Sequence, residues 1–234
     1  MGEKQAKRDL RSDLLLIAAL ISWAFFVNRQ FRISGLYKDD LYTWSCWGEQ
    51  SFLQYAFPLD STRCRFVYWT LSWLELGFIG GHLEWIVPIN ILLNAGLASF
   101  LYYFAKRLSG SRTVAFLVGA LFLGSHFAYY QIGQLLGLME TLGVFFALLQ
   151  AFFLYRYLRG ESERKDFLLA LLVYFLNCFT HERYMVLLPM FFYCLLIRRD
   201  KKWQRYLAVL AVFLLVQGIR FVMIGTVSPE GTGG

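Results

Sequence analysis

Two adjacent aspartates, Asp39 and Asp40, are the residues of this sequence best suited to acid–base chemistry. They lie in the segment Gly35–Ser45 (GLYKDDLYTWS), directly after Lys38. Two close carboxylates raise the pKa of one of them, while a neighbouring cation keeps the other ionised, so one could act as a general base. The pair could equally bind a divalent cation such as Mg²⁺ or Mn²⁺. It could also simply begin a helix in a solvated loop.

A second charged group, in the sequence THER, could bind an anion at the start of a helix. It consists of Thr180, His181, Glu182 and Arg183. An arginine and a histidine near a helix start favour a phosphate or carboxylate ligand. The alternative is an arginine that extends toward the membrane surface and pairs with the adjacent glutamate. Arg220 could be a second phosphate-binding residue or an ordinary interface anchor.

One carboxylate, Glu140, interrupts a stretch of 43 residues that is otherwise uncharged, Thr113–Tyr155. A carboxylate is costly to place in lipid, so Glu140 should face a polar cavity. Gln131 and Gln134 are expected on the same side of this helical hairpin. A position at the outer membrane interface, which nearby glycines would permit, accounts for Glu140 equally well.

Cysteines and histidines give weaker signals. Cys46 and Cys64 fall in one polar loop, where a disulfide could form in an oxidising compartment. His82 and His126 are isolated, and such histidines are more often structural than metal ligands. The sequence has no zinc-ligand spacing and none of the motifs GxxxxGK[ST], HExxH or GxSxG. Soluble nucleotide-binding and hydrolase chemistries therefore have no sequence support.

The composition indicates where these polar residues must lie. The 234 residues are 58% hydrophobic and 17% charged, and their mean hydropathy is +0.48. A soluble domain is roughly 45 to 50% apolar and about 25% charged. This excludes a water-soluble monomer, and 23 Phe, 14 Tyr and 7 Trp exclude a disordered chain. We expect one all-α integral membrane domain over residues 1–234.

Seven membrane-spanning helices are predicted, because one span needs roughly 20 apolar residues. The 43-residue stretch must form two of them, with a turn near Tyr129–Gln134. The first span is interpreted as an uncleaved signal anchor, since no small-x-small cleavage site follows it. The last three are short and depend on tilt or on snorkelling. The spans are Leu14–Val27, Trp85–Ala105, the two halves of Thr113–Tyr155, Phe167–Thr180, Tyr184–Ile197 and Tyr206–Ile219.

The basic residues predict the orientation of these spans, because cytoplasmic loops are rich in Lys and Arg. With a cytoplasmic N-terminus, 16 of the 23 Lys and Arg lie inside. The net charge of +7 is thus a topology signal and not evidence for a nucleic-acid partner. The seven on the outer side are Arg29, Arg32, Lys38, Arg63, Arg65, Arg183 and Arg220.

The one long outer loop, residues 28–84, carries the aspartate pair. Within it, Phe66–Phe78 (FVYWTLSWLELGF) is too short to span a bilayer. Its aromatic residues are typical of a helix that lies in the membrane interface.

Together these features resemble the polytopic C-type glycosyltransferases, which include protein O-mannosyltransferases and bacterial relatives that use polyprenyl-phosphate sugars. The resemblance rests on the outer loop with its acidic pair, and on an arginine, Arg63 or Arg65, before the aromatic helix. It continues with the second span (INILLNAGLASFLYYFAKRL) and the turn THERY. The Arg-Pro typical of the family is absent. Family members usually continue into further spans, so this chain resembles a fragment or a minimal member.

The resemblance implies sugar transfer from a polyprenyl-phosphate donor to a glycan, lipid or protein acceptor, at the outer face of the plasma membrane. Asp39 would be the catalytic base, and Asp40 would orient the acceptor or hold a cation. The other residues expected to bind substrate are Gln134, Glu140, His181, Glu182, Arg183, Arg220, Arg63 and Arg65. The alternative function is a lipid or solute transporter, or a non-catalytic subunit of a membrane complex.

Overall fold

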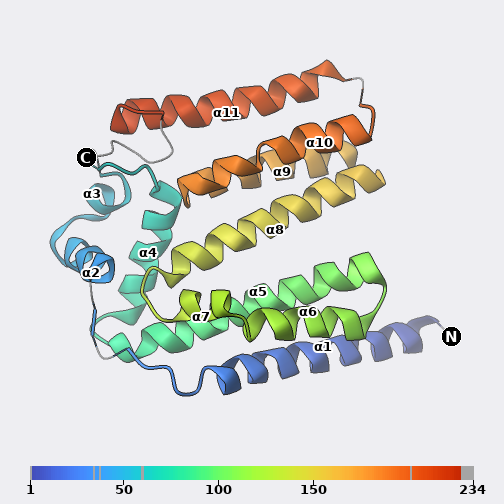
Figure 1. Ribbon diagram of the computed structural model, residues 1–234, viewed down its shortest axis with the longest axis horizontal. Helices are drawn as coiled ribbons and strands as arrows, with labels where there is room; N and C mark the ends of the chain where they lie inside the picture. The colour runs from blue at the N-terminus through green and yellow to red at the C-terminus, as the bar shows by residue number, and fades with distance from the viewer. Residues whose placement is uncertain (1, 34, 37, 59–60, 201, 228–234) are drawn as a thin grey trace. The chain divides into compact units, whose positions relative to one another are not determined.

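The structure is a computed structural model that describes residues 2–33, 35–36, 38–58, 61–200 and 202–227. Within these ranges it consists of helices joined by loops and contains no strand (Figure 1). This confirms the all-α fold class. The chain forms two compact units, Met1–Tyr42 with Ile79–Thr141 and Thr43–Phe78 with Leu142–Gly234. The prediction of a single domain stays a prediction.

The first unit is built on three helices that lie side by side, α1, α5 and α6 (Figure 1). Small residues allow their close approach, since a Cβ at Gly119 of α6 would lie 3.0 Å from Leu20 of α1. Serine side chains cap the N-termini of α6 and α7. Ser111 Oγ accepts a hydrogen bond from Val114 N, and Ser125 Oγ accepts one from Ala128 N. The helices are α1 (Gly2–Val27), η1 (Leu83–Trp85), α5 (Ile86–Ser109), α6 (Arg112–Leu123) and α7 (His126–Ile132).

The second unit packs its helices around buried aromatic residues, among them Tyr174, Phe179 and Phe191. Helix α2 (Asp39–Glu49) and helix α8 (Gly137–Arg159) begin in the first unit and continue into the second. The remaining helices are α3 (Phe52–Ala56), α4 (Phe66–Ile79), α9 (Glu163–Cys178), η2 (Glu182–Leu187), α10 (Pro189–Ile197) and α11 (Trp203–Ile224).

Among the residues that the structure describes, four helices are long and apolar enough to cross a membrane: Asp9–Val27, Leu83–Ser109, Gly137–Arg159 and Trp203–Ile224. They fall on four of the seven predicted spans. The other three predicted spans coincide with shorter helical segments, so the count of seven stays a prediction. Many large apolar side chains on these helices are exposed, for example Leu15 at 71% and Leu214 at 66%. Such surfaces are expected where helices face lipid.

Several predicted boundaries are displaced for local reasons. The third predicted span is divided at Gly124, where Ser125 caps a new helix. The following turn, predicted near Tyr129–Gln134, lies after Ile132 in the structure. The helix predicted over Tyr184–Ile197 consists of η2 followed by α10, which Pro189 begins. By contrast, α4 matches the aromatic helix predicted over Phe66–Phe78 to within one residue.

Candidate functional site

The two aspartates lie in the first turn of α2 but have different surroundings. The Asp40 carboxylate accepts hydrogen bonds from the backbone N–H groups of Leu135 at 2.9 Å and Leu136 at 3.0 Å. Burial raises the pKa of Asp40, and the charge of Asp39 adds to this, although the two hydrogen bonds oppose it. Asp39 itself is exposed. Asp39 is thus the accessible carboxylate of the pair, and Asp40 anchors the connection between α7 and α8.

Two buried asparagines of helix α5 also bind the segment that connects α7 and α8. Asn90 Nδ2 donates to the carbonyls of Ile132 at 3.2 Å and Gln134 at 2.8 Å. Asn94 Nδ2 donates to Thr141 Oγ1 at 3.3 Å. The pair was not predicted from the sequence, although two asparagines four residues apart in an apolar helix (INILLN) were a signal for it.

The predicted residues Gln131, Gln134 and Glu140 lie in and beside this connection. Glu140 is only 6% exposed and lies in the first turn of α8, not in the middle of a span. Gln131 is fully buried at the end of α7. A Cβ at Gly137 would lie 1.8 Å from the carbonyl oxygen of Gln131, so the backbone approaches itself closely here. The turn between α7 and α8 therefore requires a glycine at position 137.

In the second unit, the carboxylate of Glu182 binds two arginines that precede α4. Arg65 Nε lies 2.7 Å from Oε2, and its Nη2 lies 2.6 Å from Oε1. Arg63 Nη1 lies 3.2 Å from Oε1. Glu182 is 4% exposed. Burial raises the pKa of its carboxyl, but the hydrogen bonds and charge of Arg65 outweigh this and lower the pKa to about 2.

Backbone contacts explain how these distant residues meet. The carbonyl of Phe179, at the end of α9, accepts from the N–H groups of Val67 at 3.2 Å and Tyr68 at 3.4 Å. The rings of Phe66 and Phe179 stack with centroids 4.4 Å apart. The start of α4 is thereby fastened beside the turn that carries Glu182. Both arginines proposed as alternatives for the family position reach the same carboxylate.

Arg220 of α11 adds a third cation to this group. Its side chain is fully buried, and it interacts electrostatically with Glu182 and Cys64. Burial raises the pKa of the Cys64 thiol to about 11, which the positive charge of Arg220 partly opposes. A surface anchor would extend into water. The buried position of Arg220 within this unit therefore favours the interpretation that it serves the charged group.

His181 and Arg183 flank Glu182 in the sequence and differ in exposure. His181 Nδ1 accepts a hydrogen bond from the backbone N–H of Arg183 at 3.2 Å. Burial, aided by the charge of Arg65, lowers the pKa of His181 to about 4, so the imidazole is neutral at neutral pH. The Arg183 side chain is exposed, with its guanidinium carbon 5.7 Å from the centroid of the Tyr184 ring.

The divalent cation stays a prediction, whereas the disulfide considered for Cys46 and Cys64 is not formed. Over the described ranges, no group of three or more His, Cys, Asp and Glu side chains could hold a metal ion. Both oxygens of Asp40 already accept backbone hydrogen bonds. All four cysteines are free, including Cys46 and Cys64.

No known protein family, curated protein or solved structure matches this chain. The chemistry of the candidate site therefore has to be inferred from its own geometry.

Proposed function

We propose that this protein transfers a sugar from a polyprenyl-phosphate donor to an acceptor at the outer face of a membrane. The observation that carries the proposal is the group of Arg63, Arg65 and Arg220 about the buried carboxylate of Glu182. We call these four residues the arginine group. Among them, positive charges outnumber the negative one, which suits a site for an anionic leaving group.

The arginine group fits a lipid phosphate for electrostatic reasons. When the bond between sugar carbon C1 and the phosphate oxygen breaks, negative charge develops on that oxygen. Prearranged guanidinium groups stabilise this charge more effectively than water, which would have to reorganise. Arg63 is 40% exposed and can contact a ligand directly, while Glu182 fixes the orientation of Arg65. Arg183, exposed on the adjacent turn, would be a further phosphate contact.

Asp39 would act on the acceptor. The acceptor hydroxyl transfers its proton to the carboxylate, and its oxygen forms the new bond to C1. Asp39 is exposed at the first turn of α2, whereas Asp40 is committed to the backbone of Leu135 and Leu136. The products are the glycosylated acceptor and the free polyprenyl phosphate. General base catalysis of this kind typically contributes roughly 10²- to 10⁴-fold to the rate.

The proposal includes the membrane topology expected from the basic residues. It places the N-terminus in the cytoplasm and adds three spans to the four long helices. The first consists of α6 and α7 together, the second is α9, and the third consists of the end of η2 and α10. In support, α9 and α10 carry exposed Leu168, Leu172 and Leu196. Labelling of single cysteines at positions 39 and 183 should find both on the outer face. Opposite sides would remove the assignment of the two residues to one reaction.

The first test is turnover. Purified protein is incubated with a panel of polyprenyl-phosphate sugars and a membrane extract that supplies acceptor hydroxyl groups, and loss of sugar from each donor is followed. We expect one donor to be consumed by wild type and by Arg159→Gln, which alters an exposed arginine outside the site. Asp39→Asn should reduce turnover at least roughly 100-fold and leave donor binding intact. No consumption of any donor, or turnover of Asp39→Asn within a few-fold of wild type, would contradict the proposal.

Transport of a solute or lipid is the second candidate, and one observation favours it. The third predicted span is interrupted at Gly124, between α6 and α7, and it ends beside the buried side chains of Asn90 and Gln131. Interrupted helices with polar linings are typical of transporter binding sites. Uptake or lipid exchange in proteoliposomes, without any loss of donor sugar, would support this function in place of sugar transfer.

A further inference from the structure

A pocket of about 440 Å³ lies in the first unit, where α1 ends and α5 begins. Its wall is largely apolar, formed by Phe25, Phe31, Val87, Pro88 and Ile91. Val87 and Ile91 are 7% and 4% exposed, so this wall belongs to the packed core of the unit. An apolar pocket with a few charged groups is typical of a site for an amphiphilic ligand.

The pocket lies at the ends of two candidate membrane spans. One of them ends at Val27 and the other begins at Leu83. Aromatic side chains are exposed at this level, with Trp23 at 40%, Phe26 at 55% and Trp85 at 51%. Exposed tryptophans at span ends are typical of the boundary between lipid and water. A ligand in this pocket would therefore lie at the depth of phospholipid headgroups.

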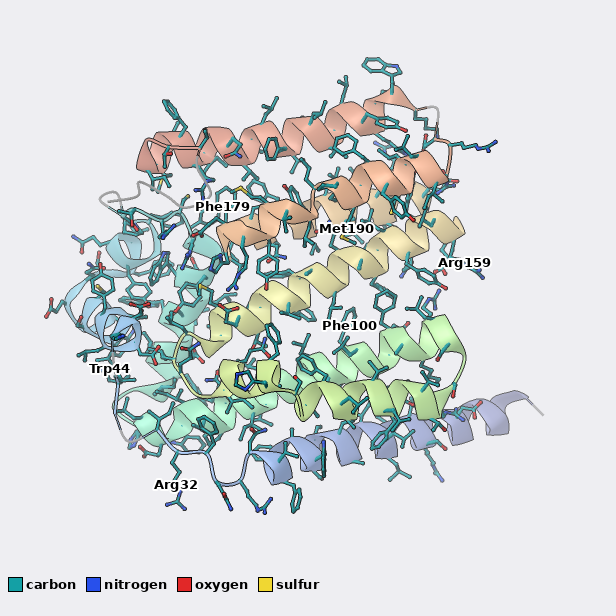
Figure 2. The ribbon with its side chains drawn as sticks, viewed as in Figure 1. Arg32, Trp44, Phe100, Arg159, Phe179 and Met190 are labelled. Carbon is teal, nitrogen blue, oxygen red and sulfur yellow. The ribbon has the colours of Figure 1, made fainter. Side chains whose placement is uncertain are left out.

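Two arginines line the pocket from the turn that follows α1. Arg29 is held in place by Phe26. Its Nη1 donates to the Phe26 carbonyl at 2.8 Å, and its guanidinium carbon lies 4.4 Å from the centroid of the Phe26 ring. Arg32 points outward from the unit (Figure 2). The turn itself is closed by the bond from Phe31 N to the Asn28 carbonyl at 2.9 Å. Both guanidiniums are exposed and available to a phosphate.

One carboxylate lines the same pocket. Glu84 is 70% exposed and lies 2.9 Å from His82 Nδ1. Cations from the turn after α1 and an anion from η1 match a ligand that carries both charges. An ethanolamine phospholipid is such a ligand, because it has a phosphate, a primary ammonium and acyl chains.

We propose that this pocket binds one ethanolamine phospholipid, with its phosphate at Arg29 and Arg32, its ammonium at Glu84 and an acyl chain against Val87 and Ile91. The site lies in the first unit and uses none of the arginine group, so it is independent of the proposed sugar transfer. The lipid would tie the end of α1 to the start of α5.

Lipid retention measured by native mass spectrometry tests the proposal. Detergent-purified protein is titrated with phosphatidylethanolamine, phosphatidylglycerol and phosphatidylcholine. Wild type should bind the first about fivefold more tightly than the third, whose quaternary ammonium cannot donate a hydrogen bond to Glu84. Arg32→Gln should weaken binding of all three lipids about fivefold. Glu84→Gln should abolish the preference for phosphatidylethanolamine over phosphatidylcholine.

Controls separate this site from general lipid association. Arg11→Gln alters an exposed arginine near the other end of α1 and should leave all three affinities unchanged. Arg32 lies beyond the end of α1, and thermal unfolding of its Gln variant should match wild type. Equal binding by wild type and Arg32→Gln would overturn the phosphate site. An unchanged lipid preference in Glu84→Gln would overturn the choice of an ethanolamine lipid.

Discussion

Arg65 binds both carboxylate oxygens of Glu182 across 117 residues of sequence, with distances of 2.7 Å and 2.6 Å. Such a bidentate pair fixes the plane of the guanidinium as well as its position. Arg63 shares one of the same oxygens. The buried carboxylate of Glu182 therefore orients both arginines of the loop before α4.

Replacing that carboxylate should destabilise the second unit. Glu182→Gln removes the charge that balances Arg65, and breaking one partner of a buried pair typically costs about 3 kcal/mol or more. We expect a lower midpoint of thermal unfolding in detergent. Glu161→Gln, which changes a glutamate at 32% side-chain exposure, serves as the control. Equal midpoints for Glu182→Gln and wild type would show that the pair contributes nothing.

The same pair predicts a pH dependence of stability. The pKa of Glu182 is lowered in the folded state to about 2, from an ordinary value of 4.5. A lowered carboxyl pKa contributes stability that is fully present above pH 4.5 and is lost as the pH falls toward 2. Unfolding midpoints of wild type should therefore decrease over this window more steeply than those of Glu182→Gln. Parallel curves for the two proteins would contradict the assignment.

Substitutions of Asp39 and Asp40 should differ in their effect on the free energy of unfolding. Asp40→Asn replaces one of the two acceptor oxygens by an NH2 group, which leaves one backbone N–H without its acceptor and should lower the free energy of unfolding by about 1.5 kcal/mol. Asp39→Asn changes an exposed side chain and should leave stability within about 0.5 kcal/mol of wild type. Chemical unfolding of both variants measures this. Equal destabilisation would remove the distinction between anchor and base.

Arg183 distinguishes a phosphate contact from a surface charge. If its planar guanidinium holds the lipid phosphate, Arg183→Lys should weaken transfer despite the retained charge, and Arg183→Ala should weaken it further. Donor affinity and turnover of both variants are compared with wild type, with folding checked separately. Near-wild-type values for both variants would exclude Arg183 from the site.

Gly137 should tolerate no side chain. A Cβ there would meet the carbonyl oxygen of Gln131 at 1.8 Å, whereas a Cβ at Gly96 would meet nothing within 4 Å. Gly137→Ala should therefore destabilise the connection between α7 and α8, and Gly96→Ala in helix α5 should be neutral or stabilising by up to about 1 kcal/mol. Comparison of their unfolding midpoints tests the position of this helix break. Equal effects would place the break elsewhere.

The sequence was most informative where local pattern determines structure. The aromatic run Phe66–Phe78 has turn residues on either side, and its helix was predicted to within one residue. The helix break at Gly124 was not predicted, because the apolar run continues across this residue. In the structure, the side chain of Ser125 caps the helix that follows it.

The candidate site was predicted only in part, for a physical reason. Asp39, Glu182 and Arg183 could be chosen as candidate site residues, because they are charged residues near expected helix ends. Their partners could not, because the contact of Glu182 with Arg65 depends on packing between α4 and the end of α9. No local spacing encodes a contact across 117 residues.

The affinity of the purified protein for polyprenyl phosphate itself, without sugar, decides whether the arginine group binds a lipid phosphate. Arg63 is 40% exposed, so Arg63→Gln should preserve the fold while removing one phosphate contact. We expect roughly tenfold weaker binding by Arg63→Gln, equivalent to about 1.4 kcal/mol, and unchanged binding by Arg159→Gln. Equal affinities of wild type and Arg63→Gln would contradict the claim that the arginine group receives the lipid phosphate.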